Sequence, residues 1–174
     1  VSRWRAEGNA ADSVDGNNGT VQTGVTFSGG AVGQAFSFAG SNGSVTIPAS
    51  SSLNVGLGGG FTIETWIKPS TVDLERPIVE WNSVTGGNPY PYGAHFWISV
   101  PVGYGAGPGC LYANIVDTSG GFRWLTSAAS VITTNSFQHV AVTYDKASGM
   151  AALYVNGSVV AQKNLGSFTP QTTY

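Results

Sequence analysis

The stretch that most constrains the fold runs over Phe137–Gly157, with the sequence FQHVAVTYDKASGMAALYVNG. Two runs rich in β-branched and aromatic residues, Gln138–Tyr144 and Met150–Val155, flank a polar loop that ends in glycine. Asn156-Gly157 follows, the pair best suited to a type I′ turn because both central residues of that turn need positive φ. A returning strand over Ser158–Lys163 completes an antiparallel meander. Such a meander cannot bury both of its faces alone, so the rest of the chain must supply a second sheet.

The same stretch resembles a known family. An aromatic residue followed by HVAVTYD, a glycine-containing turn and then LYVNG is similar to the central signature of laminin-G-like domains in the concanavalin A-like lectin/glucanase superfamily. Two earlier segments also resemble that family, in the family's order: Gly30–Phe38 and FTIETWIKP at Phe61–Pro69. The resemblance implies an all-β fold, namely an antiparallel two-sheet jelly-roll sandwich of the concanavalin A-like type.

The rest of the sequence also favours short strands. Gly accounts for 25 of the 174 residues and charged residues for 9%, a composition that suits tight turns between many strands and does not suit long helices. No linker or internal repeat divides the sequence, so we expect one domain over residues 1–174. Further strands are expected at Thr20–Phe27, Ala35–Phe38, Arg76–Trp81, His95–Val100, Cys110–Val116 and Phe122–Thr126.

The end of the sequence is abrupt by comparison with the family. Members continue through a further strand and a closing hydrophobic-Asp-Glu-hydrophobic strand, whereas this sequence stops at Tyr174. We therefore expect a C-terminally truncated domain with an open sheet edge, which is a route to self-association. The start at Val1 without Met predicts an excised or processed piece of a longer protein.

Charge and cysteine content argue against several functions. The net charge is −2 and the seven basic residues are scattered, so nucleic acid is not an expected partner. Cys110 is the only cysteine, which excludes an intrachain disulfide and zinc sites of the Cys/His kind. No apolar run approaches membrane-spanning length, so membrane insertion is not expected. No signal peptide opens the chain, and the extracellular or cell-surface location that we expect follows from the family resemblance.

The carboxylates do not form a catalytic pair. Hydrolases of the superfamily that this chain resembles carry two carboxylates on one strand, in a Glu-x-Asp-x-Glu pattern that is missing here. Glu75 and Glu80 differ in parity and would face opposite sides of a strand, and Glu64 stands alone. No Gly-x-Ser-x-Gly elbow accompanies the two histidines, His95 and His139. We predict that the chain is not an enzyme, and a hydrolase with an unrecognised carboxylate arrangement is the remaining catalytic alternative.

One N-terminal loop offers ligands for a hard cation. Residues 4–19 place Asp, Asn and Gly at close intervals, and Ca²⁺ is bound by carboxylate and carbonyl oxygens. Laminin-G-like domains frequently bind Ca²⁺, and the resemblance assigns Asp12 and Asn17 as its ligands here. The alternative is an ordinary loop built from Asx turns.

Aromatic residues gather in two Gly/Pro-rich loops, residues 82–94 and 101–109. Tyr and Trp stack on the apolar faces of sugar rings, while amide and carboxylate side chains bind sugar hydroxyls. We therefore predict a ligand-binding set in or beside these loops: Tyr90, Tyr92, His95, Trp97 and Tyr104. Packing is the alternative role for this set, and Trp4, Trp66, Trp81 and Trp124 are expected in the core.

These observations predict a non-catalytic recognition domain of an exported multidomain protein. The favoured ligand is a polysaccharide or glycan, which makes the domain a lectin-like carbohydrate-binding module. The alternative is an adhesion domain that binds a cell-surface protein, or a structural spacer without a glycan ligand. In either case the meander at Phe137–Gly157 is predicted to be scaffold.

Overall fold

The computed structural model describes residues 1–40, 43–83 and 92–174. They form two compact units, residues 1–54 and 55–174, which are treated separately below. In the described residues the regular structure is antiparallel β, apart from two short 3₁₀ turns, η1 (Ser51–Leu53) and η2 (Val55–Leu57). None of the described helices is long and apolar enough to cross a membrane. The expected all-β class is confirmed, whereas the single domain over 1–174 stays a prediction.

The N-terminal unit contains four short strands, β1 (Thr20–Val21), β2 (Val25–Gly29), β3 (Gln34–Phe38) and β4 (Val45–Thr46). They pair as β1 with β4 and as β2 with β3, both antiparallel. Trp4 and Asp12 form an isolated antiparallel bridge in the same unit. The rings of Phe36 and Phe38 lie 6.2 Å apart, and Phe38 is 55% exposed, so this side chain lies outside a buried core.

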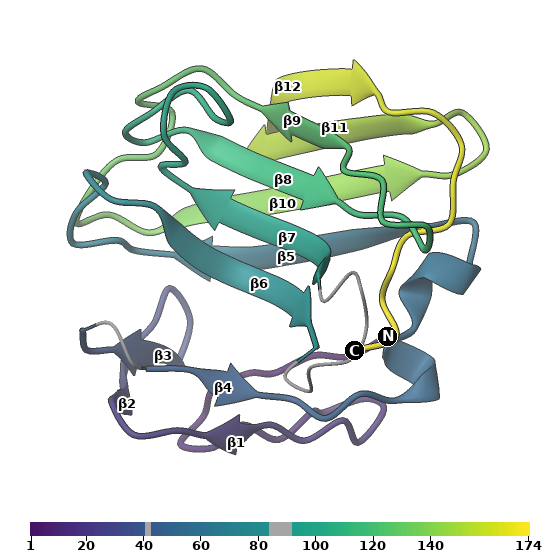
Figure 1. The fold of residues 1–174 in the computed structure, drawn as a ribbon. Helices are drawn as coiled ribbons and strands as arrows, with labels where there is room; N and C mark the ends of the chain where they lie inside the picture. The colour runs from purple at the N-terminus through teal and green to yellow at the C-terminus, as the bar shows by residue number, and fades with distance from the viewer. Residues whose placement is uncertain (41–42, 84–91) are drawn as a thin grey trace. The chain divides into compact units, whose positions relative to one another are not determined.

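The C-terminal unit is a sandwich of two four-stranded antiparallel sheets (Figure 1). One sheet contains, in spatial order, β12 (Ser158–Asn164), β11 (Met150–Val155), β10 (Gln138–Asp145) and β5 (Gly60–Ile67). The other contains β6 (Arg76–Asn82), β7 (Tyr92–Ile98), β8 (Leu111–Ile115) and β9 (Trp124–Thr126). The unit is thus an antiparallel two-sheet sandwich as the sequence predicted, with the two predicted motifs, now β5 and β10, side by side in one sheet.

The meander predicted over Phe137–Gly157 forms as expected. Asn156 and Gly157 adopt φ values of 50° and 79°, the two positive values that a type I′ turn requires. β10 lies at the centre of its sheet, since it pairs with β11 on one side and with all eight residues of β5 on the other. The returning strand β12 pairs with β11 through a register shift after Leu153. The meander thus forms three adjacent strands of this sheet, and its role as scaffold stays a prediction.

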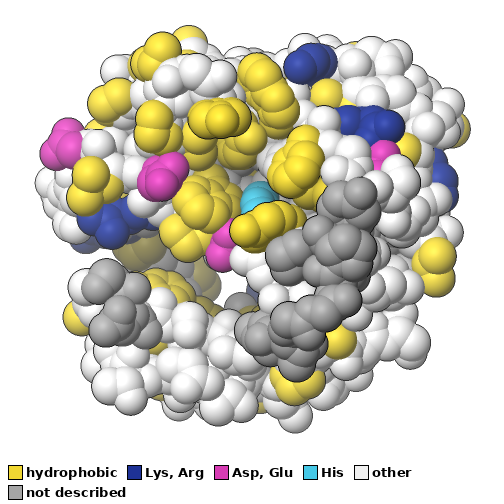
Figure 2. All heavy atoms as spheres, in the orientation of Figure 1, with side chains coloured by type: hydrophobic (Ala, Val, Ile, Leu, Met, Phe, Trp, Pro, Cys, Tyr) yellow, Lys and Arg dark blue, Asp and Glu magenta, His cyan; other side chains and the backbone are white. Residues whose placement is uncertain are grey.

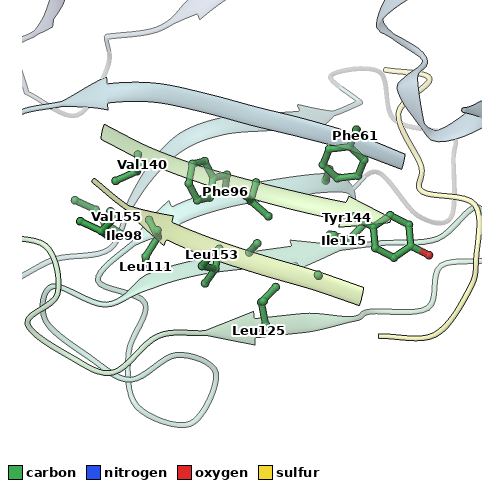
Figure 3. Packing of buried hydrophobic residues seen from close by; sticks show 14 of the residues in the cluster. Phe61, Phe96, Ile98, Leu111, Ile115, Leu125, Val140, Tyr144, Leu153 and Val155 are labelled. Atoms are coloured by element: carbon green, nitrogen blue, oxygen red, sulfur yellow. The ribbon is translucent and has the colours of Figure 1, made fainter. Parts of the chain in front are cut away.

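The hydrophobic core lies between the inner faces of the two sheets of this unit (Figure 3). The period-two alternation of a strand sends Val140, Val142 and Tyr144 inward from β10. Phe96 and Ile98 of β7 meet them from the facing sheet, and both are almost fully buried. Burial of each such side chain contributes about 1.5–3 kcal/mol to folding. The same alternation fixes which side chains of each strand point outward.

Two tryptophans expected in the core lie on outer sheet faces instead. Trp66 is 52% exposed because its neighbour in β5, Ile67, packs on the core and sends Trp66 to the other side. Trp124 is 37% exposed because Leu125 takes the inward position in β9. The core assignment of these two residues was wrong, whereas Trp81 is partly buried and packs against the core as expected.

Candidate ligand-binding site

A shallow hollow of about 460 Å³ opens on the outer face of the sheet formed by β6, β7, β8 and β9. Figure 2 shows hydrophobic side chains gathered around one histidine on this side of the molecule, with acidic side chains beside them. The hollow is lined by strand residues and by the loop that follows β7: Glu75, His95, Trp97, Val100, Pro101, Val102, Tyr104, Tyr112 and Asn114.

The floor of the hollow follows from strand alternation. Phe96 and Ile98 point into the core, so His95 and Trp97 point outward from β7. In β8 the outward residues are Tyr112 and Asn114 by the same argument, since Leu111 and Ala113 are core residues. The ladder places Trp97 directly opposite Tyr112, and His95 directly opposite Asn114. Four outward side chains therefore form one contiguous patch across two strands.

One wall of the hollow is the loop over residues 99–109. Ser99 adopts a left-handed backbone conformation with φ of 60°, which ends the alternation of β7 and turns Val100 toward the side of Trp97. Gly109 N donates to Ser99 Oγ over 3.1 Å, and Gly105 N donates to the Pro101 carbonyl over 2.8 Å. These bonds close a tight turn whose tip carries Tyr104, which is 72% exposed.

Two buried polar atoms of the patch have no hydrogen-bond partner among the described residues. They are the indole Nε1 of Trp97, a donor, and the amide Oδ1 of Asn114, an acceptor. Asn114 is only 6% exposed, so water does not readily solvate its side chain. An unpartnered buried polar atom costs about 1–3 kcal/mol of stability.

Burial sets the charge state of the patch. It lowers the pKa of the His95 imidazole from 6.5 to about 4, so His95 is neutral at pH 7. It also raises the pKa of the Tyr112 hydroxyl to about 12, with smaller contributions from Cys110 and Tyr104. His95 and Tyr112 therefore present neutral groups to a ligand at pH 7.

Glu80 lies beside the patch on the same outer face, on β6 directly opposite His95. Its Oε1 is 3.9 Å from His95 Nε2. Burial raises the pKa of the Glu80 carboxyl, and the nearby side chains of Asn82 and Trp97 oppose that shift.

Of the five residues predicted to bind ligand, three line the hollow: His95, Trp97 and Tyr104. Tyr92 lies beside it, 47% exposed, with its ring edge-on to His95 at 5.8 Å. Tyr90 lies outside the described residues. The role of the set as a binding site stays a prediction.

Sequence reasoning missed Tyr112 and Asn114, which line the hollow from β8. The signal was present, because the parity that sends Leu111 and Ala113 inward sends Tyr112 and Asn114 outward. The aromatic surface also continues to Trp124 of β9, whose ring stacks on Tyr112 with centroids 6.4 Å apart.

Asp12, a predicted calcium ligand, lies in the N-terminal unit with all sides of its carboxylate engaged. Oδ1 accepts the backbone N–H groups of Arg3 at 2.8 Å and Val14 at 3.0 Å. Oδ2 accepts those of Asp15 at 3.3 Å and Asn17 at 3.1 Å. Burial raises the pKa of the Asp12 carboxyl, but these hydrogen bonds outweigh it and hold the pKa well below its usual range.

Asn17, the second predicted calcium ligand, also makes hydrogen bonds within its unit. Its Nδ2 donates to Ser2 Oγ and to Ser52 Oγ, and its carbonyl accepts the indole N–H of Trp4 over 2.7 Å. Among the described residues, no three His, Cys, Asp or Glu side chains are grouped to hold a metal ion. A calcium ion at Asp12 would compete with the four N–H donors, and calcium binding stays a prediction.

Comparison with known proteins identifies the fold family. The sequence model of the concanavalin A-like lectin/glucanases superfamily matches residues 39–174. No curated protein matches at a significant level. The binding domain of botulinum neurotoxin serotype G is similar in structure, with a TM-score of 0.65 and 18% identity, over 93% of this chain and 39% of that domain. This chain thus spans about two fifths of that binding domain.

Domain 4 of AbnA, an extracellular arabinanase from Geobacillus stearothermophilus, was solved in complex with arabinotriose and is also similar. Its TM-score is 0.58 with 17% identity, over 93% of this chain and 75% of that domain. The receptor binding domain of botulinum neurotoxin D has a TM-score of 0.58 with 19% identity, over 89% of this chain and 37% of that domain. At these identities the likeness establishes the fold alone.

Proposed function

We propose that this chain, which belongs to the concanavalin A-like lectin/glucanases superfamily, is a non-catalytic recognition module that binds carbohydrate. The observation that carries the proposal is the hollow on the outer face of β7 and β8. It combines the aromatic rings of Trp97, Tyr104 and Tyr112 with the carboxylate of Glu75 at the margin. A sugar offers an apolar ring face for the aromatic rings and hydroxyls for the carboxylate.

The binding mode follows from where the side chains stand. Trp97 and Tyr112 form the floor on adjacent strands, and the exposed ring of Tyr104 stands on the wall, so a sugar ring entering the hollow meets aromatic surface on two sides. Glu75 supplies a carboxylate at the margin for a sugar hydroxyl.

The same lining argues against catalysis. Glycoside hydrolysis needs two carboxyl groups about 5–10 Å apart that both reach the scissile bond. Glu75 is the only carboxylate among the described residues that line the hollow, and Glu80, beside His95 on β6, is not part of that lining. We therefore retain hydrolysis only as an alternative, which turnover of a chromogenic glycoside would support.

A glycan array probed with the full chain, followed by calorimetric titration of the hits, tests the proposal. We expect Tyr104→Ala to weaken binding about five- to tenfold, because it removes an exposed stacking surface and leaves the core untouched. Trp66→Ala is the matched control, since Trp66 is an exposed aromatic residue on the opposite sheet. Equal loss of affinity in both variants, or no loss in Tyr104→Ala, contradicts this location for the site.

An adhesion or spacer role is the alternative function. It predicts an empty glycan array together with capture of a cell-surface protein by the folded chain. The proposed setting is an exported multidomain protein, acting outside the cell or at its surface. Detection of the parent protein in the culture medium or on intact cells, with a cytosolic marker absent from the same fraction, tests that setting.

A further inference from the structure

The charged residues around the hollow affect which sugars can enter it. The inference drawn from them rests on the proposed carbohydrate function. The carboxylate of Glu75 lines the margin, and the Glu80 carboxyl lies beside His95 on the same outer face. The residues that the structure does not describe next to β7, 84–91, read VTGGNPYP and carry no charged side chain. The formal charges at the hollow are thus acidic.

The basic residues of the C-terminal unit are placed elsewhere, and Figure 2 shows no Lys or Arg side chain bordering the histidine on this face. Lys163 Nζ lies over the ring of Trp124 and donates to the Trp124 carbonyl over 2.9 Å. Arg123 pairs with Asp117 and stacks on Phe168.

The C-terminal unit has three further basic residues, Lys68, Arg76 and Lys146. Arg76 is opposite the core residue Ile98, so it shares the inner side of the sheet. Lys68 is over the ring of Phe137, and Lys146 donates to Thr169 Oγ1 over 2.9 Å. None of these lines the hollow.

We infer that the hollow selects uncharged oligosaccharides and rejects those that carry a carboxylate, such as sialylated or uronate-containing glycans. A carboxylate in the hollow would meet Glu75 without a cation to pair with, and it would lose water to enter a site floored by aromatic rings. An uncharged sugar meets the same surface without that repulsion. Selectivity thus comes from a repulsive element as well as from stacking.

Titration of the full chain with matched pairs of glycans tests the inference. Suitable pairs are a galacto-oligosaccharide with and without terminal sialic acid, and a xylo-oligosaccharide with and without glucuronate side groups. We expect the acidic member of each pair to bind at least about tenfold more weakly at low salt, and the difference to shrink as added salt screens the repulsion.

A variant that removes one negative charge provides a second test of the inferred repulsion. Glu75→Gln should narrow the gap between the acidic and neutral members, because it removes the repelling carboxylate and keeps the side-chain shape. Glu64→Gln is the control and should leave the gap unchanged, since Glu64 projects from β5 of the other sheet with a 66% exposed side chain. Equal or tighter binding of the acidic members by the unaltered chain overturns the inference. Absence of binding to either member overturns the proposed carbohydrate function itself.

Discussion

His95 Nε2 lies 2.7 Å from Asn82 Oδ1, a distance that makes the imidazole the donor and fixes the neutral tautomer with its proton on Nε2. Asn82 ends β6 and His95 is in β7, so this bond joins the two strands at the side of the hollow. Protonation of His95 would place a second proton on a ring that is mostly buried, which is why the pKa of His95 falls to about 4.

The first prediction concerns stability against pH. The pKa of His95 is lower in the folded chain, about 4, than its ordinary value of 6.5, so the unfolded chain binds more protons between those values. The stabilisation from neutral His95 is fully present above pH 6.5 and is lost as the pH falls toward 4. Denaturant titrations from pH 4 to 7 should show His95→Gln with a smaller loss of stability over this window than the parent. Identical pH profiles for the two proteins contradict the prediction.

The second prediction compares two buried polar residues, Asn114 and Gln138. Asn114 Oδ1 has no hydrogen-bond partner among the described residues, whereas Gln138 Oε1 accepts a hydrogen bond. Asn114→Leu removes an unpartnered buried acceptor, so the variant should be as stable as the parent or more stable. Gln138 accepts from Thr133 N over 2.7 Å and donates to the Val131 carbonyl over 3.2 Å. Gln138→Leu should therefore lose about 1–3 kcal/mol of stability. Chemical denaturation measures both effects, and destabilisation by Asn114→Leu as large as that by Gln138→Leu would contradict this account.

The third prediction concerns the wall of the hollow. A Cβ added at Gly105 would lie 2.4 Å from the Val100 carbonyl oxygen, so Gly105→Ala must displace the loop that carries Tyr104. We expect weaker glycan binding with only a modest change in Tm. Gly157→Ala is the control, because its φ of 79° makes alanine strained at a turn where the added Cβ has nothing within 4 Å among the described residues. It should lower stability by about 1 kcal/mol and leave affinity unchanged; the reverse pattern would refute the role of the loop.

Asp117 gives the fourth prediction. Burial raises the pKa of its carboxyl, but hydrogen bonds from Ser119 and Gly121 and the pairing with Arg123 outweigh it and lower the pKa to about 2. This stabilisation is present above the ordinary value of 3.8 and is lost as the pH falls through about 2. Asp117→Asn should cost about 1–3 kcal/mol at pH 7 and much less at pH 2. A cost that does not change with pH in denaturant titrations would show that the charge is irrelevant.

Asp12 is the subject of the fifth prediction. Asp12→Asn should lower the Tm of the chain, because a neutral amide is a weaker acceptor for the four backbone N–H groups around it. Calcium titration of the unaltered chain tests the calcium hypothesis separately: binding predicts a Tm that rises with calcium and no such rise in Asp12→Asn. A Tm unaffected by calcium, with no heat of binding, rejects Asp12 and Asn17 as calcium ligands.

The strands were predictable because residue types alternate along them. FTIETWIKP and HVAVTYD alternate with a period of two, which fits a β-strand and not a helix. In the structure they form the neighbouring strands β5 and β10. The same rule, applied to Trp66 and Trp124, would have placed both on outer faces. Hydrophobicity alone put them in the core, where the positions were already taken by Ile67 and Leu125.

The geometry of the site was less accessible from sequence. Ser99 is an ordinary polar residue in the sequence, and its left-handed conformation depends on tertiary bonds such as the one from Gly109. The unpartnered state of Asn114 likewise depends on what surrounds it, since nothing in the run LYANI distinguishes this amide from one that is fully bonded. Residue types indicated an aromatic surface, but register and burial defined it.

The hollow is built partly from strands and partly from one loop, and these two parts tolerate insertions to different degrees. One residue inserted into β7 would exchange its inward and outward side chains, so Trp97 would enter the core and Phe96 would face solvent. The loop over residues 99–109 is free of that constraint, because it is anchored at Ser99 and Gly109 and carries Tyr104 on a separate turn. Grafting loops of other lengths between these two anchors should therefore yield new specificities on an unchanged sandwich, which makes this the segment to randomise in a binding library.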